Sequence, residues 1–147
     1  MTPIPISIPP DVFRFSDWPI SVPKLPGTYA IWRGSTLIYV GEAGSRWKPQ
    51  KPGSSHLKLR LSHHANANRS DVFTTYVFER FIGRHLPEED WTLIERGVRH
   101  MTDYAKKYIR NELSFSFATT SNHTQALEWE KRIQYGELGS KPVINPL

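Results

Sequence analysis

Hydrophobic positions are concentrated in two short runs near the start of the chain, residues 28–33 and 36–41. Both runs are rich in β-branched and aromatic residues, and the sequence Arg-Gly-Ser at 33–35 lies between them. Strand-forming runs separated by a short glycine-containing turn are typical of a β-hairpin. We therefore predict two antiparallel strands joined by a tight turn.

The pattern changes to helical spacing after a loop rich in glycine and proline at 42–55. Residues 56–67 place Leu57 and Leu61 on one face, with Ser54 or Ser55 as the expected N-cap. Residues 69–82 have the composition of a strand but the apolar spacing of a helix, and we favour the helix. Residues 86–113 also have a helical pattern, which Gly97 divides in two.

The C-terminal part of the chain predicts one more strand and one more helix. Residues 114–120 alternate in period two and place Phe115 and Phe117 on one face, which is typical of a strand. Ser121 or Asn122 is the expected N-cap of a helix at 123–138, which Gly136 or Gly139 would end. This order predicts an α/β (mixed α+β) fold, with a small three-stranded antiparallel sheet flanked by helices.

Residues 1–26 contain many prolines and predict an extended arm that Phe13, Phe15 and Trp18 anchor to the rest of the chain. We expect a single domain at 27–147 that carries a helical insert at about 71–113. The length of 147 residues and the 38% hydrophobic content agree with one globular core.

Composition narrows the classes of protein. The chain has no cysteine, which excludes disulfides, cysteine metal ligands and a thiol nucleophile and is consistent with a reducing compartment. We find neither the pattern of a signal peptide nor an apolar run of about 18 residues, so we expect a soluble cytoplasmic protein with no membrane contact.

Charge is concentrated in one stretch. The formal net charge is +5, and residues 42–69 hold six basic side chains against Glu42 alone, so the rest of the chain is neutral. A localised basic region indicates a polyanionic partner such as nucleic acid, although a solvated basic loop would look the same. Three histidines at 56, 63 and 64 lack the spacing of a zinc site.

The hairpin carries two Gly/Tyr clusters, Gly27-Thr28-Tyr29 and, nine residues on, Tyr39-Val40-Gly41. This pair resembles the paired signature of GIY-YIG nucleases, whose first two strands bear the two triplets. "LKLRL" resembles the family's next helix with its arginine, here Arg60. "ALEWEKRI" resembles the segment with the metal-binding glutamate, here Glu130, and "KPVIN" resembles the C-terminal segment that ends in an asparagine, here Asn145.

Two features place this chain within that resemblance. The interval from Gly41 to Arg60 is longer than in the nuclease half of excision-repair incision enzymes and is more similar to restriction-type members, some of which have a histidine where this chain has His64. Many members have a lysine directly after the second triplet, whereas this chain has Glu42. The assisting lysine is then left open among Lys48, Lys51 and Lys58.

The resemblance implies a metal-dependent DNA endonuclease, a hydrolase that leaves 5′-phosphate and 3′-hydroxyl ends with one Mg²⁺ or Mn²⁺. Tyr29 and Tyr39 would be the phenols near the scissile phosphate, Arg60 the phosphate clamp, and Glu130 the metal ligand. His64 would relay or donate a proton, and Asn145 would orient the site. The basic stretch would contact DNA through Arg46, Trp47, Lys48, Lys51, Lys58 and Arg69.

Each of these residues also has an ordinary structural explanation. The tyrosines could pack in the sheet, Arg60 could be a solvated helix residue, and Asn145 could belong to a terminal turn. Glu130 competes with Glu128 as metal ligand, and His63 competes with His64.

Two other functions are compatible with the sequence. A non-catalytic nucleic-acid-binding module on a nuclease fold would explain Glu42, and a scaffold protein would use the basic loop to meet an acidic protein. The form of the DNA (single-stranded, duplex or branched), the oligomeric state and the choice among restriction, repair, mobile-element and defence roles stay open.

Overall fold

A four-stranded antiparallel sheet organises the chain, in a computed structural model that describes residues 2–45, 47 and 55–145. The hairpin is formed by β2 (Gly27–Arg33) and β3 (Thr36–Ala43), as predicted, and Gly34 makes the turn with φ +61°. The later strand, β4 (Leu113–Thr119), pairs with β2. The sheet order is β1-β4-β2-β3, so β3 is one of the two edge strands.

The prediction of three strands was wrong by one, because the N-terminal arm contributes the two-residue strand β1 (Phe13–Arg14). The short 3₁₀ turn η1 (Phe15–Asp17) follows it. Phe15 is fully buried and its ring packs on Phe115, with ring centroids 4.7 Å apart. Paired hydrogen bonds and this aromatic contact hold the proline-rich segment against the sheet.

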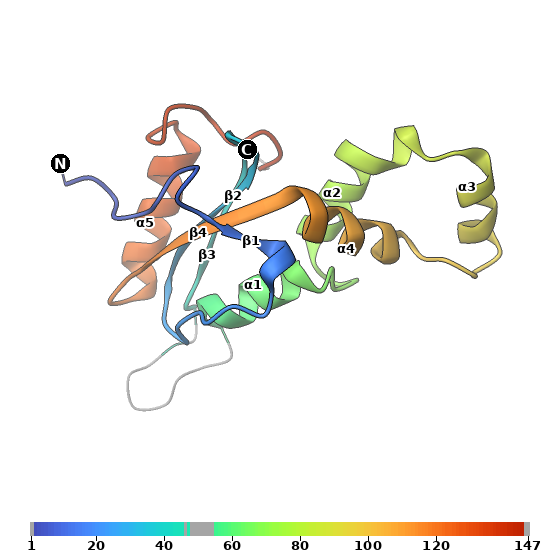
Figure 1. Ribbon diagram of the computed structural model, residues 1–147. Helices are drawn as coiled ribbons and strands as arrows, with labels where there is room; N and C mark the ends of the chain where they lie inside the picture. Colours follow the sequence, from blue (N-terminus) through green and yellow to red (C-terminus); the bar gives the residue numbers. More distant parts are fainter. Residues whose placement is uncertain (1, 46, 48–54, 146–147) are drawn as a thin grey trace.

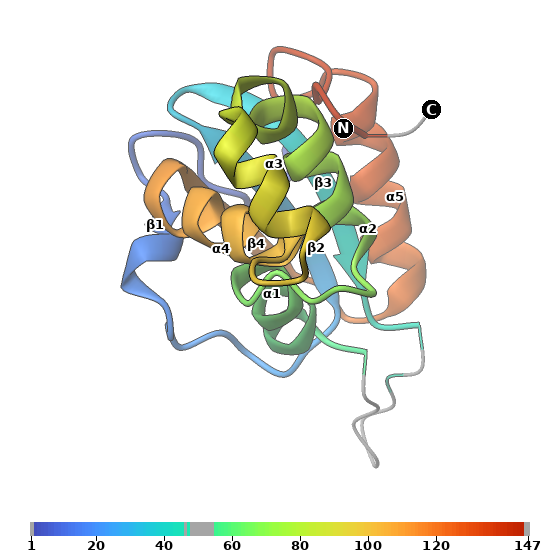
Figure 2. The same cartoon turned by 90° about the vertical axis from the view of Figure 1, so that its right-hand side faces the viewer.

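Helices cover both faces of the sheet, as Figures 1 and 2 show. On one face, α5 (His123–Gln134) packs on Ala30, Trp32 and Val40 through Ile133. On the other, Tyr29 and Ile31 face α1 (Leu57–Ala65), α2 (Val72–Val77) and α4 (Met101–Glu112). Successive residues of β2 therefore enter two separate cores, which is why this strand is buried almost throughout.

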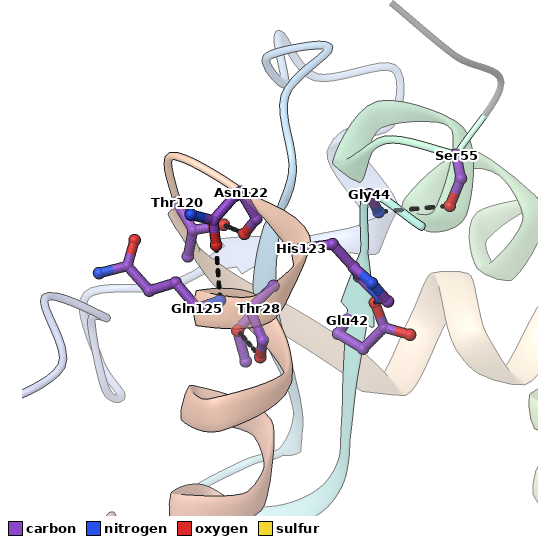
Figure 3. A network of polar contacts seen from close by, with 9 residues as sticks. Thr28, Glu42, Gly44, Ser55, Thr120, Asn122, His123 and Gln125 are labelled. Atoms are coloured by element: carbon purple, nitrogen blue, oxygen red, sulfur yellow. Dashed lines mark hydrogen bonds and ion pairs between the residues drawn. The ribbon is translucent and has the colours of Figure 1, made fainter. Parts of the chain in front are cut away.

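Two predicted helix starts can be compared with the structure. The last helix begins at the predicted cap, since the Asn122 side chain accepts a hydrogen bond from the Gln125 N–H at 2.8 Å. The cap of α1 is instead His56, which accepts from the Leu59 N–H at 3.1 Å. Ser55 accepts a hydrogen bond from the Gly44 N–H at 3.3 Å, so it ties β3 to the α1 entry rather than capping the helix (Figure 3).

Residues 69–112 are mainly helical with short turns between the helices, and their far end projects from the sheet (Figure 1), so we call this region the lobe. After α2 comes one π-helical turn, η2 (Phe78–Ile82), then η3 (Gly83–His85) and α3 (Glu88–Glu95). Helix α3 ends two residues before the predicted Gly97, where φ is +73° and the Val98 N–H bonds back to the Leu93 carbonyl at 2.9 Å. The lobe then returns to the sheet through α4. No helix in the described part of the chain is long and apolar enough to cross a membrane.

Candidate active site

The two glycines of the hairpin make room for specific neighbours. Gly41 lies opposite Tyr29 in the β2–β3 register, and a Cβ at residue 41 would lie 2.3 Å from the Tyr29 hydroxyl oxygen. A Cβ at Gly27 would lie 2.5 Å from Leu57 Cδ1, at the start of α1. Each Gly/Tyr cluster therefore contains a candidate site tyrosine and a glycine whose missing side chain leaves room for a neighbouring residue. Gly41 admits the phenol of Tyr29, and Gly27 admits the helix that carries Arg60.

Tyr29 begins a buried chain of hydrogen bonds. Its hydroxyl lies 2.6 Å from Nε2 of His64, and Nδ1 of His64 bonds to the Asp71 carboxylate. Tyr29 and His64 are fully buried, and only 7% of the Asp71 side chain is exposed. The sequence did not identify Asp71, although an aspartate before a helical run is an N-cap signal. Its second carboxylate oxygen does cap α2, accepting from the Phe73 N–H at 3.1 Å.

Burial and nearby charges determine which atoms carry protons in the Tyr29–His64–Asp71 hydrogen-bond chain. Burial lowers the pKa of His64, so its ring is neutral at neutral pH and its contact with Asp71 is a hydrogen bond rather than an ion pair. Burial alone would raise the pKa of Asp71, but the bond from His64 and the charge of Arg60 outweigh it and lower that pKa. Nδ1–H therefore donates to Asp71, and Nε2 accepts from the Tyr29 hydroxyl.

A cleft of about 300 Å³ lies beside this chain. It is lined by Tyr39, Arg60, His63, Ser70, Asp71 and Val72. The structure separates the two histidines that the sequence left open, because His63 lines the cleft while His64 is buried behind it. Asp71 belongs both to the cleft wall and to the buried chain, and so connects them.

Arg60 is half-buried between the two tyrosines and the cleft. Burial lowers the pKa of its guanidinium, but Tyr29, Asp71 and Tyr39 raise that pKa by more. The net shift is upward, so Arg60 stays charged. Burial raises the pKa of Tyr39 to about 12 and that of Tyr29 well above its usual value, although Arg60 opposes both shifts. Both phenols are therefore protonated at neutral pH in the environment that the described residues provide.

Glu130 lies on α5, on the other face of the sheet, and its charge still acts on Tyr39 and Arg60. Burial and the nearby Glu42 carboxylate raise the pKa of Glu130 to about 7, while His123, Arg60 and Lys131 lower it. Glu42 is bonded to His123 at 2.6 Å, at the point where β3 passes the start of α5 (Figure 3). Glu128, the rival candidate, lies on an exposed face of α5 beside Lys131 and Arg132. Of the two glutamates, the structure brings only Glu130 within electrostatic reach of Arg60.

Asn145 acts on the backbone of β3. Its side-chain oxygen accepts from the Val40 N–H at 2.6 Å, and its amide donates to the Val40 carbonyl at 2.7 Å. The Ile144 N–H adds a bond to the Ile38 carbonyl at 2.9 Å. The C-terminal segment thus holds the free edge of β3 on both sides of Tyr39, and the Asn145 amide does not line the cleft.

The predicted DNA contacts are only partly placed. Arg46, Lys48 and Lys51 lie outside the described residues. The Trp47 indole N–H donates to the Lys24 carbonyl at 3.2 Å, so this ring is tied to the N-terminal segment. Lys58 on α1 and Arg69 after it are exposed.

The side chains near the site that could hold a metal ion are carboxylates. Among the residues that the structure describes, no group of three or more His, Cys, Asp or Glu side chains is arranged to hold an ion. Glu130, whose ionisation is disfavoured by the nearby Glu42 carboxylate, could hold one cation that keeps most of its water ligands, as Mg²⁺ usually does.

Comparisons of this chain with protein-family models, with curated proteins and with solved structures give no match.

Proposed function

We propose that this chain is a metal-dependent DNA endonuclease of the GIY-YIG superfamily. The observation that carries the proposal is the buried Tyr29–His64–Asp71 chain beside a cleft that contains Arg60 and Tyr39. Tyrosines that only pack a core would not need a buried histidine and a buried carboxylate in line with one phenol. The same order of groups, a hydroxyl, an imidazole and a carboxylate, moves protons in hydrolytic enzymes.

Arg60 binds the phosphate in this proposal. Its planar guanidinium suits two phosphate oxygens, and its raised pKa keeps it charged. Tyr29 does not line the cleft, whereas Arg60 lies against Tyr29 and lines the cleft as well. A phosphate that draws Arg60 toward itself would open a path from the cleft to the Tyr29 hydroxyl.

The buried chain then removes a proton from the attacking water. The water gives its proton to the Tyr29 oxygen while Tyr29 passes its own to His64 Nε2, and Asp71 stabilises the imidazolium. The hydroxide forms the new bond to phosphorus, and the bond from phosphorus to the 3′ oxygen breaks. The leaving oxygen takes a proton from solvent. Tyr29 thus works as a neutral relay, which agrees with its raised pKa.

Glu130 is the residue that would hold Mg²⁺ or Mn²⁺. The bound ion supplies positive charge for the phosphate as negative charge develops on it. The neighbouring Glu42 stands where many members of the family have a lysine, and its carboxylate is paired with His123.

The test is cleavage of an end-labelled DNA duplex with Mg²⁺ or Mn²⁺, followed by analysis of the new ends. We expect wild type to leave 5′-phosphate and 3′-hydroxyl ends and Arg60→Gln to lose at least about 100-fold in rate. Arg14→Gln removes the same charge at the opposite edge of the sheet and should cut normally. An inactive wild type, or equal rates for both variants, would contradict the proposal.

A binding module without turnover is the second candidate, and the position of Glu42 favours it. This carboxylate raises the pKa of Glu130 and so weakens it as a metal ligand near neutral pH. If wild type binds DNA without cutting it and Glu42→Lys restores cleavage, the chain is a nuclease fold that has lost its activity.

A further inference from the structure

The helical lobe carries an exposed basic face that continues from the cleft. Ser70 lines the cleft, and the adjacent Arg69 lines a small recess on the lobe together with Met101 and Thr102 of α4. At the other end of α4, Arg110 donates to the Ala65 carbonyl at 2.7 Å and to the Asn66 side chain at 3.0 Å. This side of α4 therefore lies along the end of α1 and the link that follows it.

Lys106 lies on the same side of α4. It is one helical turn from Thr102 and one from Arg110, so all three share a face. Lys106 is exposed, as are Arg69 and the two arginines of the α3–α4 turn, Arg96 and Arg99. The stretch of α4 from its start to Arg110 is about 15 Å long, the axial length of four to five base pairs.

Within the part of the chain that the structure describes, these cations form no ion pair with a carboxylate. All three ion pairs within the described residues are elsewhere, at His64–Asp71, His123–Glu42 and Arg132–Glu137. Two acidic side chains, Glu95 and Asp103, lie near the turn and are exposed, and the Asp103 carboxylate is engaged with the His100 N–H at 2.8 Å. Exposed cations that remain unpaired inside the chain are available to an external polyanion.

The α3–α4 turn is closed by its own backbone hydrogen bonds. The Val98 and Gly97 N–H groups bond to the Leu93 and Ile94 carbonyls at 2.9 and 3.0 Å, which closes the C-terminal end of α3. Val98 is 60% exposed and Met101 45%, so aliphatic side chains stand beside the arginines at the tip. A preformed turn would lose little conformational entropy on binding.

We propose that the exposed cations along α4 and in the α3–α4 turn, Arg69, Lys106, Arg99 and Arg96, bind the phosphate backbone of duplex DNA next to the bond in the cleft. The proposal rests on the proposed function, since it takes the cleft as the place of the scissile phosphate. These residues offer exposed cations with aliphatic groups beside them, which suit a phosphate backbone, whereas single strands are usually held by stacked aromatic rings. An acidic protein is the competing occupant.

The test is the binding of a fluorescent 20-base-pair duplex in EDTA, measured by anisotropy between 50 and 200 mM salt. We compare wild type with the triple variant Arg69→Gln/Arg99→Gln/Lys106→Gln. The matched control, Arg14→Gln/Arg80→Gln/Arg84→Gln, removes three exposed charges from β1 and from the η2–η3 segment, which runs along the opposite side of the lobe from the turn (Figures 1 and 2).

We expect the triple variant to bind at least about tenfold more weakly at 100 mM salt, and its salt slope to fall by up to about 2.7, because each phosphate contact contributes about 0.9. The control should bind as wild type. Equal binding of the triple variant and wild type, no duplex binding by wild type at 50 mM salt, or an equal loss on a single strand of the same sequence would each overturn the proposal.

The two proposals fail in different ways in this experiment, because binding in EDTA needs no turnover. A protein that binds duplex through this face but cuts nothing in Mg²⁺ or Mn²⁺ refutes the endonuclease and retains the surface. A protein that cuts duplex while the triple variant binds as wild type refutes the surface and retains the endonuclease.

Discussion

Replacing Asp71 with asparagine tests the proton chain without changing its shape. The Asp71 carboxylate accepts from Nδ1–H of His64 and fixes the tautomer whose Nε2 faces Tyr29. An asparagine amide that donates to Nδ1 would leave Nε2 protonated, with no lone pair for the Tyr29 proton. In hydrolases with a hydroxyl–histidine–aspartate chain, this change lowers turnover by about 10⁴-fold. We expect Asp71→Asn to lower the cleavage rate by about 10³- to 10⁴-fold.

The cost in stability should be much smaller than the cost in rate. Asparagine is as good an N-cap as aspartate, so α2 keeps its cap. The lost charge-assisted bond to His64 is worth about 2 kcal/mol, which corresponds to a fall of about 4–8 °C in the midpoint of thermal unfolding. A protein at 25 °C would stay folded and would still bind DNA.

The assay combines single-turnover cleavage with ¹⁵N NMR of the histidine ring nitrogens, which reports the His64 tautomer. Asp103→Asn serves as the control, since Asp103 accepts from the His100 N–H at the start of α4 and is exposed. It should cut DNA at the wild-type rate. If Asp71→Asn switches the tautomer yet cuts within about tenfold of wild type, the proton chain is not used in catalysis.

Three further substitutions test other parts of the site. Tyr39→Phe should fold and bind DNA but cut it about 10²- to 10⁴-fold more slowly, because Tyr39 lines the cleft in which the phosphate is proposed to bind, and cleavage at the wild-type rate would show that its hydroxyl takes no part. Gly41→Ala should lower the free energy of unfolding by about 1–3 kcal/mol in urea, because its Cβ would lie 2.3 Å from the Tyr29 hydroxyl, and an unchanged midpoint would contradict that packing. Glu130 has a pKa raised to about 7, so the native state holds its proton more tightly than the unfolded state and loses stability as pH rises from about 4.5 to 7. In EDTA, Glu130→Gln should therefore gain stability over wild type across that interval, and a difference that does not vary with pH would refute the shift.

The elements of the fold were largely predictable because they depend on local patterns. β-Branched and aromatic composition with a glycine turn predicted the hairpin, alternation predicted β4, and an asparagine at the cap and glycines at the ends bounded the helices. The strand β1 was not predictable, since two residues carry no periodic signal and pair with β4 only after the arm has folded back. His56 was missed as the cap of α1 because serine is the commoner capping residue and stands directly before it.

The candidate site was predictable as a set of residues but not as an arrangement. Tyr29, Tyr39, Arg60 and Glu130 lie around one region, and the structure distinguishes Glu130 from Glu128 by the face of α5 on which each lies. Asp71 was missed because its link to His64 joins α1 to the start of the lobe, a contact that depends on tertiary packing. Asn145 lies near Tyr39 but holds the backbone of Val40 instead of facing the cleft.

The measurement that tests the central claim most directly is cleavage of single-stranded, duplex and branched DNA by wild type and Tyr29→Phe, with Mg²⁺ or Mn²⁺. Phenylalanine removes only the hydroxyl that bonds to His64 and leaves the ring beside Gly41. We expect wild type to cut at least one of the three substrates, and Tyr29→Phe to bind that substrate but leave it intact. If wild type cuts none of them, or if Tyr29→Phe cuts as fast as wild type, the buried Tyr29–His64–Asp71 chain does not serve phosphodiester hydrolysis.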